Sequence, residues 1–224
     1  MFIEQPPLLY RLLFPEAVWR LKRHKNRRVV YLTFDDGPIP EVTPWVLDLL
    51  DHYGIKATFF LVGDNVRRHP ELLEEIKRRG HSWGNHTMHH LQGMKVKSRR
   101  YMRDITEADA LIDSPLFRPP HGIIRWKQAK GIKNHYNLIM YDLVTRDYSK
   151  KLTPDQVLAN VKRYARNGSI ICRQLLGLDP SFKPQPPEPR TDGYYKKRPC
   201  PEMVFCAAGI LEEYLDREAE MPTV

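Results

Sequence analysis

Cysteine is scarce in this 224-residue chain, and its scarcity excludes one class of protein. The three cysteines are odd in number and not paired in spacing, so they do not form the framework of a disulfide-stabilised miniprotein. We therefore expect free thiols. All three lie in the last third of the chain: Cys172, Cys200 and Cys206.

Long hydrophobic runs are also missing. No segment approaches the roughly 18–20 apolar residues that a membrane-spanning helix needs, so we expect no transmembrane span. The short apolar stretch 7–14 is interrupted by Arg11, follows an acidic residue and precedes no small-residue cleavage site, which argues against a secretory signal. With no signal recognised, a cytoplasmic location is the default expectation, and the sequence does not predict an oligomeric state.

Negative charge is in the minority, with 27 Asp and Glu against 36 Lys and Arg, a formal net charge of +9. The densest basic cluster, 20–28, has no interleaved aromatic residues and no helix–turn–helix or zinc-finger spacing, so we expect a solvated basic face and no nucleic acid partner. Just upstream, residues 8–22 are predicted to form a docking helix. Its expected packing face consists of Leu9, Leu12, Leu13, Val18 and Trp19.

Segments typical of strands and helices alternate along the rest of the chain, whose 42% hydrophobic and 28% charged residues are ordinary for a globular protein. At least six strand–helix steps imply a parallel sheet covered on both faces, either open or closed into a barrel. We predict strands at 29–34, 57–62, 81–85, just before 118, 137–143 and 168–172, and helices at 46–54, 65–79, 99–112 and 153–165.

Composition divides the chain into three regions. Residues 1–28 hold the docking helix and basic segment, and 29–175 hold the strand–helix steps. Residues 176–224 form an atypical tail with seven prolines between 180 and 201, a density that breaks helices and strands alike, although a last helix is expected at 207–216.

Two adjacent carboxylates end the first predicted strand, in the sequence Thr33-Phe34-Asp35-Asp36-Gly37-Pro38. Neighbouring side chains on a strand point to opposite sides, so one aspartate can bind a metal ion while the other remains a free base. Taken by itself, this dipeptide is better explained by an ordinary Asp-Gly turn or a helix cap.

A histidine cluster follows the third predicted strand. His86 and His90 are four residues apart, so on one helical turn their imidazoles would share a face and bind one ion. Two imidazoles and one carboxylate, with positions left for water and substrate, make a catalytic rather than a structural metal site. The aspartate pair and this cluster both follow strands, so we expect them at the same end of the sheet.

A third strand end carries Phe117-Arg118-Pro119-Pro120-His121-Gly122. Arg118 can orient a neighbouring carboxylate and keep it ionised, and the backbone N–H of His121 could face a developing oxyanion. Taken alone, this segment is a weak signal.

Together these segments resemble the first three motifs of the polysaccharide deacetylase family, also called the NodB-homology domain or carbohydrate esterase family 4. Asp142 to Tyr148 resembles the fourth motif, with Asp147-Tyr148 where the family has Asp-Trp. The resemblance covers about residues 29–172. It implies a distorted (β/α) barrel, either complete or lacking its C-terminal part, and the removal of N- or O-acetyl groups from amino-sugar polymers.

The resemblance also implies roles for individual residues. One divalent metal ion, zinc first with cobalt or nickel as alternatives, is bound by Asp36, His86 and His90. Asp35 is the general base, supported in catalysis by Arg118 and Asp147. The acetylated carbohydrate is expected to contact Pro120, His121 and Tyr148.

The chain departs from this family where a fifth motif should place a histidine. Gly168-Ser169-Ile170-Ile171 is followed by Cys172-Arg173-Gln174, so Gln174 stands near the expected histidine, and no histidine occurs after His135. Glutamine cannot deliver a proton, and Asp147 loses its expected partner. Impaired deacetylation, with His121 or water as substitute acid, is one reading, and a carbohydrate-binding pseudoenzyme that keeps the metal site is the alternative. Either a divergent C-terminus or a reading-frame change after about Ile171 would explain the departure.

Overall fold

The computed structural model describes residues 4–22, 28–147, 149 and 151–175. The proline-rich tail, its expected last helix and Tyr148 lie outside these residues, and the division of the chain into three regions remains a prediction. None of the helices in the described part is long and apolar enough to cross a membrane.

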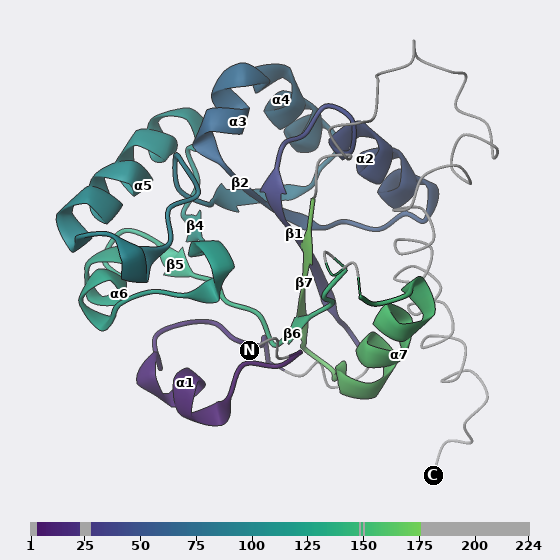
Figure 1. Cartoon of the computed structure of the whole chain (residues 1–224). Helices are drawn as coiled ribbons and strands as arrows, with labels where there is room; N and C mark the ends of the chain where they lie inside the picture. The colour runs from purple at the N-terminus through teal and green to yellow at the C-terminus, as the bar shows by residue number, and fades with distance from the viewer. Residues whose placement is uncertain (1–3, 23–27, 148, 150, 176–224) are drawn as a thin grey trace.

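Seven strands of the described chain form one parallel sheet in the order β5-β4-β3-β2-β1-β7-β6 (Figure 1). The sheet curls and helices cover its outer face, so the fold is the predicted distorted (β/α) barrel. The strands are β1 (Tyr31–Gly37), β2 (Thr58–Leu61), β3 (Ser82–Asn85), β4 (Leu116–Phe117), β5 (Asn137–Leu138), β6 (Leu143–Val144) and β7 (Ile170–Gln174).

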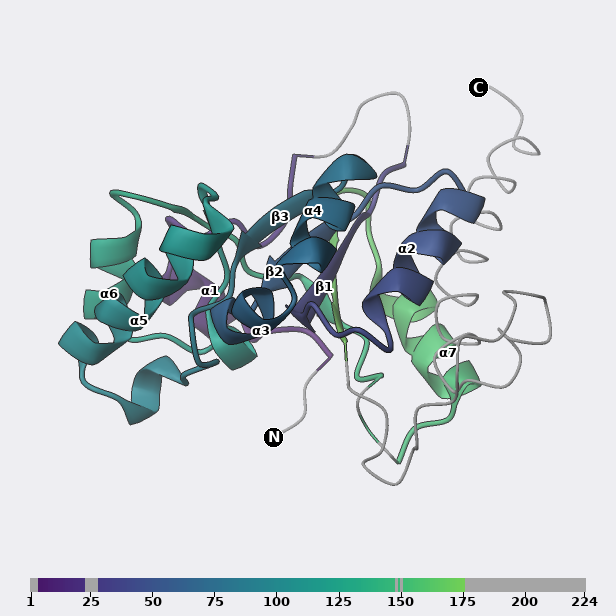
Figure 2. The same ribbon diagram turned by 90° about the horizontal axis from the view of Figure 1, so that it is seen from above.

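The helices alternate with these strands, as the spacing of apolar residues predicts (Figure 2). They are α1 (Leu8–Leu13), α2 (Thr43–His52), α3 (Gly63–Arg68), α4 (Pro70–Arg78), α5 (Ser98–Ile112), α6 (Trp126–Ile132) and α7 (Pro154–Tyr164), with short 3₁₀ turns η1 (Gly93–Lys95) and η2 (Pro120–Gly122).

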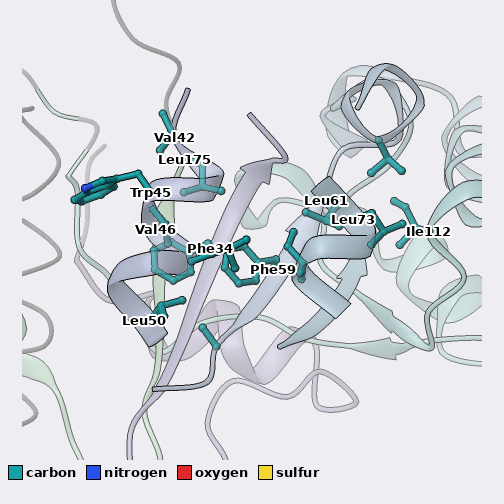
Figure 3. Close-up of a cluster of buried hydrophobic side chains, with 14 of the residues drawn as sticks. Phe34, Val42, Trp45, Val46, Leu50, Phe59, Leu61, Leu73, Ile112 and Leu175 are labelled. Atoms are coloured by element: carbon teal, nitrogen blue, oxygen red, sulfur yellow. The ribbon is translucent and has the colours of Figure 1, made fainter. Parts of the chain in front are cut away.

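The main core lies between the sheet and helices α2, α4 and α5 (Figure 3). Phe34 of β1 stacks on Phe59 of β2 with ring centroids 5.1 Å apart, and both rings are almost completely buried. Leu175, directly after β7, belongs to this cluster. The side chains on the other face of β1 are thereby left for the barrel interior.

Two predicted elements are split in the structure. The helix expected at 65–79 is two helices, because Pro70 has no N–H to donate and restricts His69 before it, which takes φ −137° and ψ 60°. The strand expected at 137–143 is two short strands at opposite edges of the sheet, β5 and β6, and the intervening residues cross from one edge to the other.

The N-terminal segment spans the gap between these two edges. Val18 donates to Leu138 O at 2.8 Å on the β5 side, and Leu21 donates to Gly168 O at 2.9 Å beside β7. Buried Asp142 accepts hydrogen bonds from Arg11 at 2.7 Å and from Arg20 at 2.7 and 3.1 Å. The segment is therefore anchored by backbone pairing and by one buried carboxylate.

The predicted docking helix 8–22 is wrong in its length and in the packing of its three leucines, whereas Trp19 of the predicted face does pack against buried side chains. Helix α1 ends at Leu13, because Pro15 disfavours helical geometry at Phe14. The expected contact residues Leu9, Leu12 and Leu13 are 73, 66 and 55% exposed. The buried carboxylate of Asp142 requires charged partners, and Arg11 is one of them. Helix α1 therefore turns Arg11 inward and leaves its leucines outside.

Candidate metal and catalytic site

The two adjacent aspartates lie at the carboxyl end of β1, where its pairing with β2 is irregular. Asp36 has φ 72°, a left-handed conformation that is uncommon outside glycine. Its backbone carbonyl accepts a 2.9 Å hydrogen bond from Asn65, which helps to hold this geometry. Asp35 remains in strand geometry and is 5% exposed, so the two carboxylates enter different surroundings, as the sequence predicts.

His86 and His90 are brought to Asp36 by a loop after β3 rather than by the predicted helical turn. Left-handed φ values of 68° at Thr87 and 53° at His90 bend this loop. Asn85 Oδ1 accepts the Thr87 N–H at 2.8 Å and so stabilises the bend. The two histidines that the spacing pairs lie together, although the helical turn expected to bring them together is absent.

Three ligand atoms converge at this loop. Asp36 Oδ1 lies 2.9 Å from His90 Nε2 and 3.5 Å from His86 Nε2, and the ligand atoms of the group all lie within 4.8 Å of one another. His86 Nδ1 is 2.8 Å from the Arg118 carbonyl, a contact that fixes which ring nitrogen faces the group.

This group suits a divalent ion. Asp36 Oδ1 and His90 Nε2 are buried, and neither has a hydrogen-bond partner of acceptable geometry. Burial would raise the pKa of Asp36, but the two imidazoles beside it hold that pKa well below its ordinary value. One ionised carboxylate and two imidazoles form the donor set of catalytic zinc sites, and other transition metals accept it too.

Arg118, whose side chain is completely buried, fixes the second aspartate. Its guanidinium donates to Asp35 Oδ1 at 2.7 Å and to Thr33 Oγ1 at 2.6 Å. The same group lies 4.1 Å from the ring centroid of Phe60 and donates to the Met140 carbonyl at 2.8 Å. An arginine with this many partners cannot move without breaking several of them, so Asp35 is held in one orientation.

Cys172 is a contact of Asp35 that sequence reasoning missed. Its thiol donates to Asp35 Oδ2 at 3.2 Å. Burial, and then the charge of Asp35, raise the pKa of Cys172, so the sulfur keeps its proton. Pairing of Thr33 with Cys172 in adjacent strands brings the two residues together, and that register was the signal that could have identified the contact.

The η2 turn lies beside the metal-binding group. His121, at φ 60°, places its ring centroid 4.8 Å from that of His90, and Pro120 before it is buried. Burial first, and then the charges of His90, His86 and Lys95, lower the pKa of His121, whereas Asp36 opposes them.

Two tyrosines hold this turn, and the sequence analysis identified neither. Tyr141 donates to the His121 carbonyl at 3.2 Å, and Tyr10 of α1 donates to the Gly122 carbonyl at 2.9 Å. The N-terminal segment therefore reaches the side of the candidate site.

Asp147 has partners of another kind. It accepts from Thr145 Oγ1 at 2.7 Å and from Arg173 Nε at 3.1 Å, and the side chains of Asp147 and Arg173 are 7 and 4% exposed. The histidine expected to partner Asp147 is absent from the sequence, and Arg173 contacts Asp147 instead. The strand register pairs Gln174 with Asp35, so Gln174 lies on the same face of β7 as Cys172.

Comparison with known proteins identifies the family. Residues 22–137 match the family model described as polysaccharide deacetylase. A peptidoglycan-N-acetylglucosamine deacetylase of Bacillus cereus is 34% identical over 182 residues, covering 78% of this chain and 85% of the relative. A chitooligosaccharide deacetylase of Rhizobium leguminosarum bv. trifolii is 41% identical over 151 residues, covering 64% and 70%.

Solved structures agree with this result. The crystal structure of a peptidoglycan N-acetylglucosamine deacetylase, Bc1960, in complex with a naphthalenyl N-oxidanyl-benzamide superposes with a TM-score of 0.68 at 30% identity. The superposition covers 75% of this chain and 80% of that one.

Proposed function

This chain belongs to the polysaccharide deacetylase family, and we propose that it is a divalent-metal-dependent hydrolase that removes N- or O-acetyl groups from amino-sugar polymers. The observation that carries the proposal is the convergence of Asp36, His86 and His90 beside the Asp35–Arg118 pair. The names of the relatives favour N-acetylglucosamine polymers as the first substrates to test.

In this proposal Asp36, His86 and His90 hold the ion, with zinc first and cobalt or nickel as alternatives. A divalent ion bound there would polarise the acetyl carbonyl and lower the pKa of a water molecule to about 7. A site with three protein ligands leaves coordination positions open, as a catalytic site requires.

Asp35 accepts the proton of the attacking water. Its Oδ1 is committed to Arg118, and its Oδ2 has only the weak thiol donor of Cys172, so Oδ2 is the oxygen better placed to take a proton. The backbone of the η2 turn, held by Tyr10 and Tyr141, lies beside this reaction centre, and the backbone N–H of His121 is its candidate donor to the developing oxyanion.

Protonation of the leaving group is the weak step. A guanidinium is a poor general acid and an amide has no titratable proton, so neither Arg173 nor Gln174 serves in this role. His121 lies beside His90 and is the substitute acid in this proposal, with water as the alternative. An amine leaving group needs this proton more than an alcohol does, so hydrolysis of amides should suffer more than hydrolysis of esters.

The lack of a histidine at the position of Gln174 favours a second candidate function. With Gln174 in place of an imidazole, the chain would bind metal and acetylated glycan but turn over slowly, as a carbohydrate-binding pseudoenzyme. Metal binding alone does not separate the two functions, because both retain Asp36, His86 and His90.

Acetate release separates them. The full chain, loaded with zinc, cobalt or nickel, is incubated with chitooligosaccharide, peptidoglycan and acetylated xylan, with and without a chelator. Acetate release that stops with the chelator supports the hydrolase. Stoichiometric metal and glycan binding without acetate release would support the pseudoenzyme, and failure to bind metal would contradict both.

A further inference from the structure

One surface beside the candidate site carries an unusual charge distribution. The chain has no Asp or Glu in residues 76–103 or 114–141, although it has 27 elsewhere. These two stretches contain the loops that follow β3 and β4, together with η1, η2, the first turn of α5 and all of α6. We use the name basic edge for six exposed residues in them: Lys95, Lys97, Arg125, Trp126, Lys127 and Lys130.

The two halves of the basic edge are joined. Arg125 donates to the carbonyl of Met94 in η1 at 2.6 Å, and Gln128 of α6 donates to Gly93 at 3.0 Å. Lys130 Nζ lies 3.7 Å from the ring centroid of Trp126, which is 52% exposed. Helices α5 and α6 lie side by side at one end of the molecule (Figures 1 and 2).

The cations of the basic edge differ from those of α3 and α4. On α3 and α4, Arg68 pairs with Asp64 at 2.8 Å, and Lys77 pairs with Glu74 at 2.9 Å. Within the described residues, none of the cations of the basic edge pairs with a carboxylate. A surface formed only for solubility would be expected to mix both signs, as α3 and α4 do.

The basic edge adjoins the candidate site. Loops that follow parallel strands lie at the carboxyl edge of the sheet, which is where the metal-binding group is found. The His121-Gly122 turn runs through two residues into Arg125, and the charge of Lys95 acts on the His121 imidazole. A polymer with one acetyl group at the metal-binding group would extend over the surface next to that group. The basic edge is part of this surface.

We propose that the basic edge binds the carboxylates of an anionic acetylated glycan, so that the chain prefers sugars flanked by acidic groups to a neutral polymer. The proposal rests on the proposed function, since it takes the acetyl sugar to lie at Asp36, His86 and His90. The unpaired ammonium groups attract carboxylates, and exposed Trp126 offers a flat apolar surface to a sugar ring. Attraction between exposed charges weakens as salt rises, because the Debye length is about 10 Å at 0.1 M.

Two tetrasaccharides of equal length test this preference. One alternates N-acetylglucosamine with N-acetylmuramic acid, whose lactyl ether carries a carboxylate, and the other is neutral chitotetraose. Affinities for both are measured by calorimetry at low salt with a chelator present, so that hydrolysis cannot intervene. We expect the wild type to bind the carboxylated sugar about tenfold more tightly, from several weak charge contacts.

The variant Lys95→Gln, Lys127→Gln, Lys130→Gln should bring the ratio of the two affinities close to one. The control Lys22→Gln, Lys56→Gln, Lys162→Gln removes the same charge from exposed lysines outside the two stretches without Asp or Glu and should keep the ratio. Thermal unfolding of both triple variants checks that a lost preference is not a lost fold.

The outcomes separate this proposal from the proposed function. A wild-type ratio near one, or a ratio that falls equally in both triple variants, would overturn the role of the basic edge while leaving acetate release to be judged separately. Tighter binding of duplex DNA or of phosphatidylglycerol vesicles than of the carboxylated tetrasaccharide would also overturn it. An intact ratio without acetate release from either sugar would overturn the proposed function alone.

Discussion

The two halves of the candidate site use similar side chains in different ways. On the β1–β3–β4 side, Asp36 and His90 each leave a buried atom without a hydrogen-bond partner, and Asp35 keeps an oxygen with only a weak donor. On the β6–β7 side, Asp142 and Asp147 are satisfied by arginines and hydroxyl groups. Groups left short of partners are available to a ligand, whereas satisfied ones stabilise the fold. The comparison therefore assigns metal binding and catalysis to the β1–β3–β4 half, and stabilisation of the fold to the β6–β7 half.

Removing a ligand should abolish metal binding, the largest effect expected in the first half. Asp36→Ala or His90→Ala leaves two protein ligands, too few for a stable site of this kind. Metal content after gel filtration is the measurement, and His135→Ala, which changes an exposed histidine outside the site, is the control. Stoichiometric metal in both ligand variants would show that these residues are not the ligands.

Asp35→Asn should separate metal binding from chemistry. The amide keeps the shape of the side chain but cannot accept a proton, so metal content should remain while acetate release falls by about two to four orders of magnitude. Equal turnover by the variant and the wild type would make Asp35 a structural residue and remove the general base from the mechanism.

Asp142→Asn should reduce stability rather than binding, which tests the anchoring role of the second half. The side chain is completely buried, while Arg11 and Arg20 are 21 and 39% exposed, so we expect a loss of about 2–3 kcal/mol in the free energy of unfolding at pH 7. Metal content at pH 7 should be unchanged. A variant as stable as the wild type would contradict the role of Asp142 as an anchor.

The pH dependence of that loss follows from the pKa of Asp142. Burial would raise this pKa, but the hydrogen bonds from Ser169, Arg20 and Arg11 outweigh burial and hold it below the ordinary value. A carboxyl group with a lowered folded pKa contributes stability above its unfolded pKa of about 3.9, and the contribution disappears as the pH falls through the folded pKa. Urea unfolding at pH 7 and pH 3 should therefore show a smaller difference between variant and wild type at pH 3.

Gln174→His should give the β6–β7 half of the site a proton donor and so part of a catalytic role. The register places Gln174 opposite Asp35 and on the face of β7 that carries Cys172, so an imidazole there would point toward the general base. We expect about a tenfold gain in acetate release from amides, below the full effect of a general acid, and little gain from esters. Equal activities of variant and wild type on both substrates would contradict this expectation.

The smallest effects are expected at the exposed leucines of α1, for which the buried Phe14 serves as the comparison. Leu9→Ser and Leu12→Ser should each change the free energy of unfolding by less than about 0.5 kcal/mol, because both side chains are mainly in solvent. Phe14→Ala, at a position 4% exposed, should cost about 3 kcal/mol. A large loss in either serine variant would restore the leucine face that the sequence predicts.

The sequence predicts well those features that depend on local order. The alternation of strands and helices, the strand ends that carry Asp35, Asp36 and Arg118, and the pairing of His86 with His90 all follow from spacing. The resemblance to one family then supplies the barrel. These features need little knowledge of distant contacts.

Features that depend on distant contacts were missed or predicted wrongly. The leucines of α1 look like a packing face until Asp142, far along the chain, draws Arg11 inward. Cys172 looks like an isolated thiol until the register of β1 with β7 places it beside Asp35. Proline effects are local, however, and Pro15 and Pro70 could have been used to end the helices before them.

The ratio of ester to amide hydrolysis tests the account most directly. Acetate release by the zinc-loaded chain from acetylated xylan and from chitotetraose is measured with and without a chelator. If the metal-binding group is intact and the proton donor is altered, acetate release from both substrates should stop with the chelator. The ester should then be hydrolysed clearly faster than the amide. Release that survives the chelator, or an amide rate equal to the ester rate, would contradict the account.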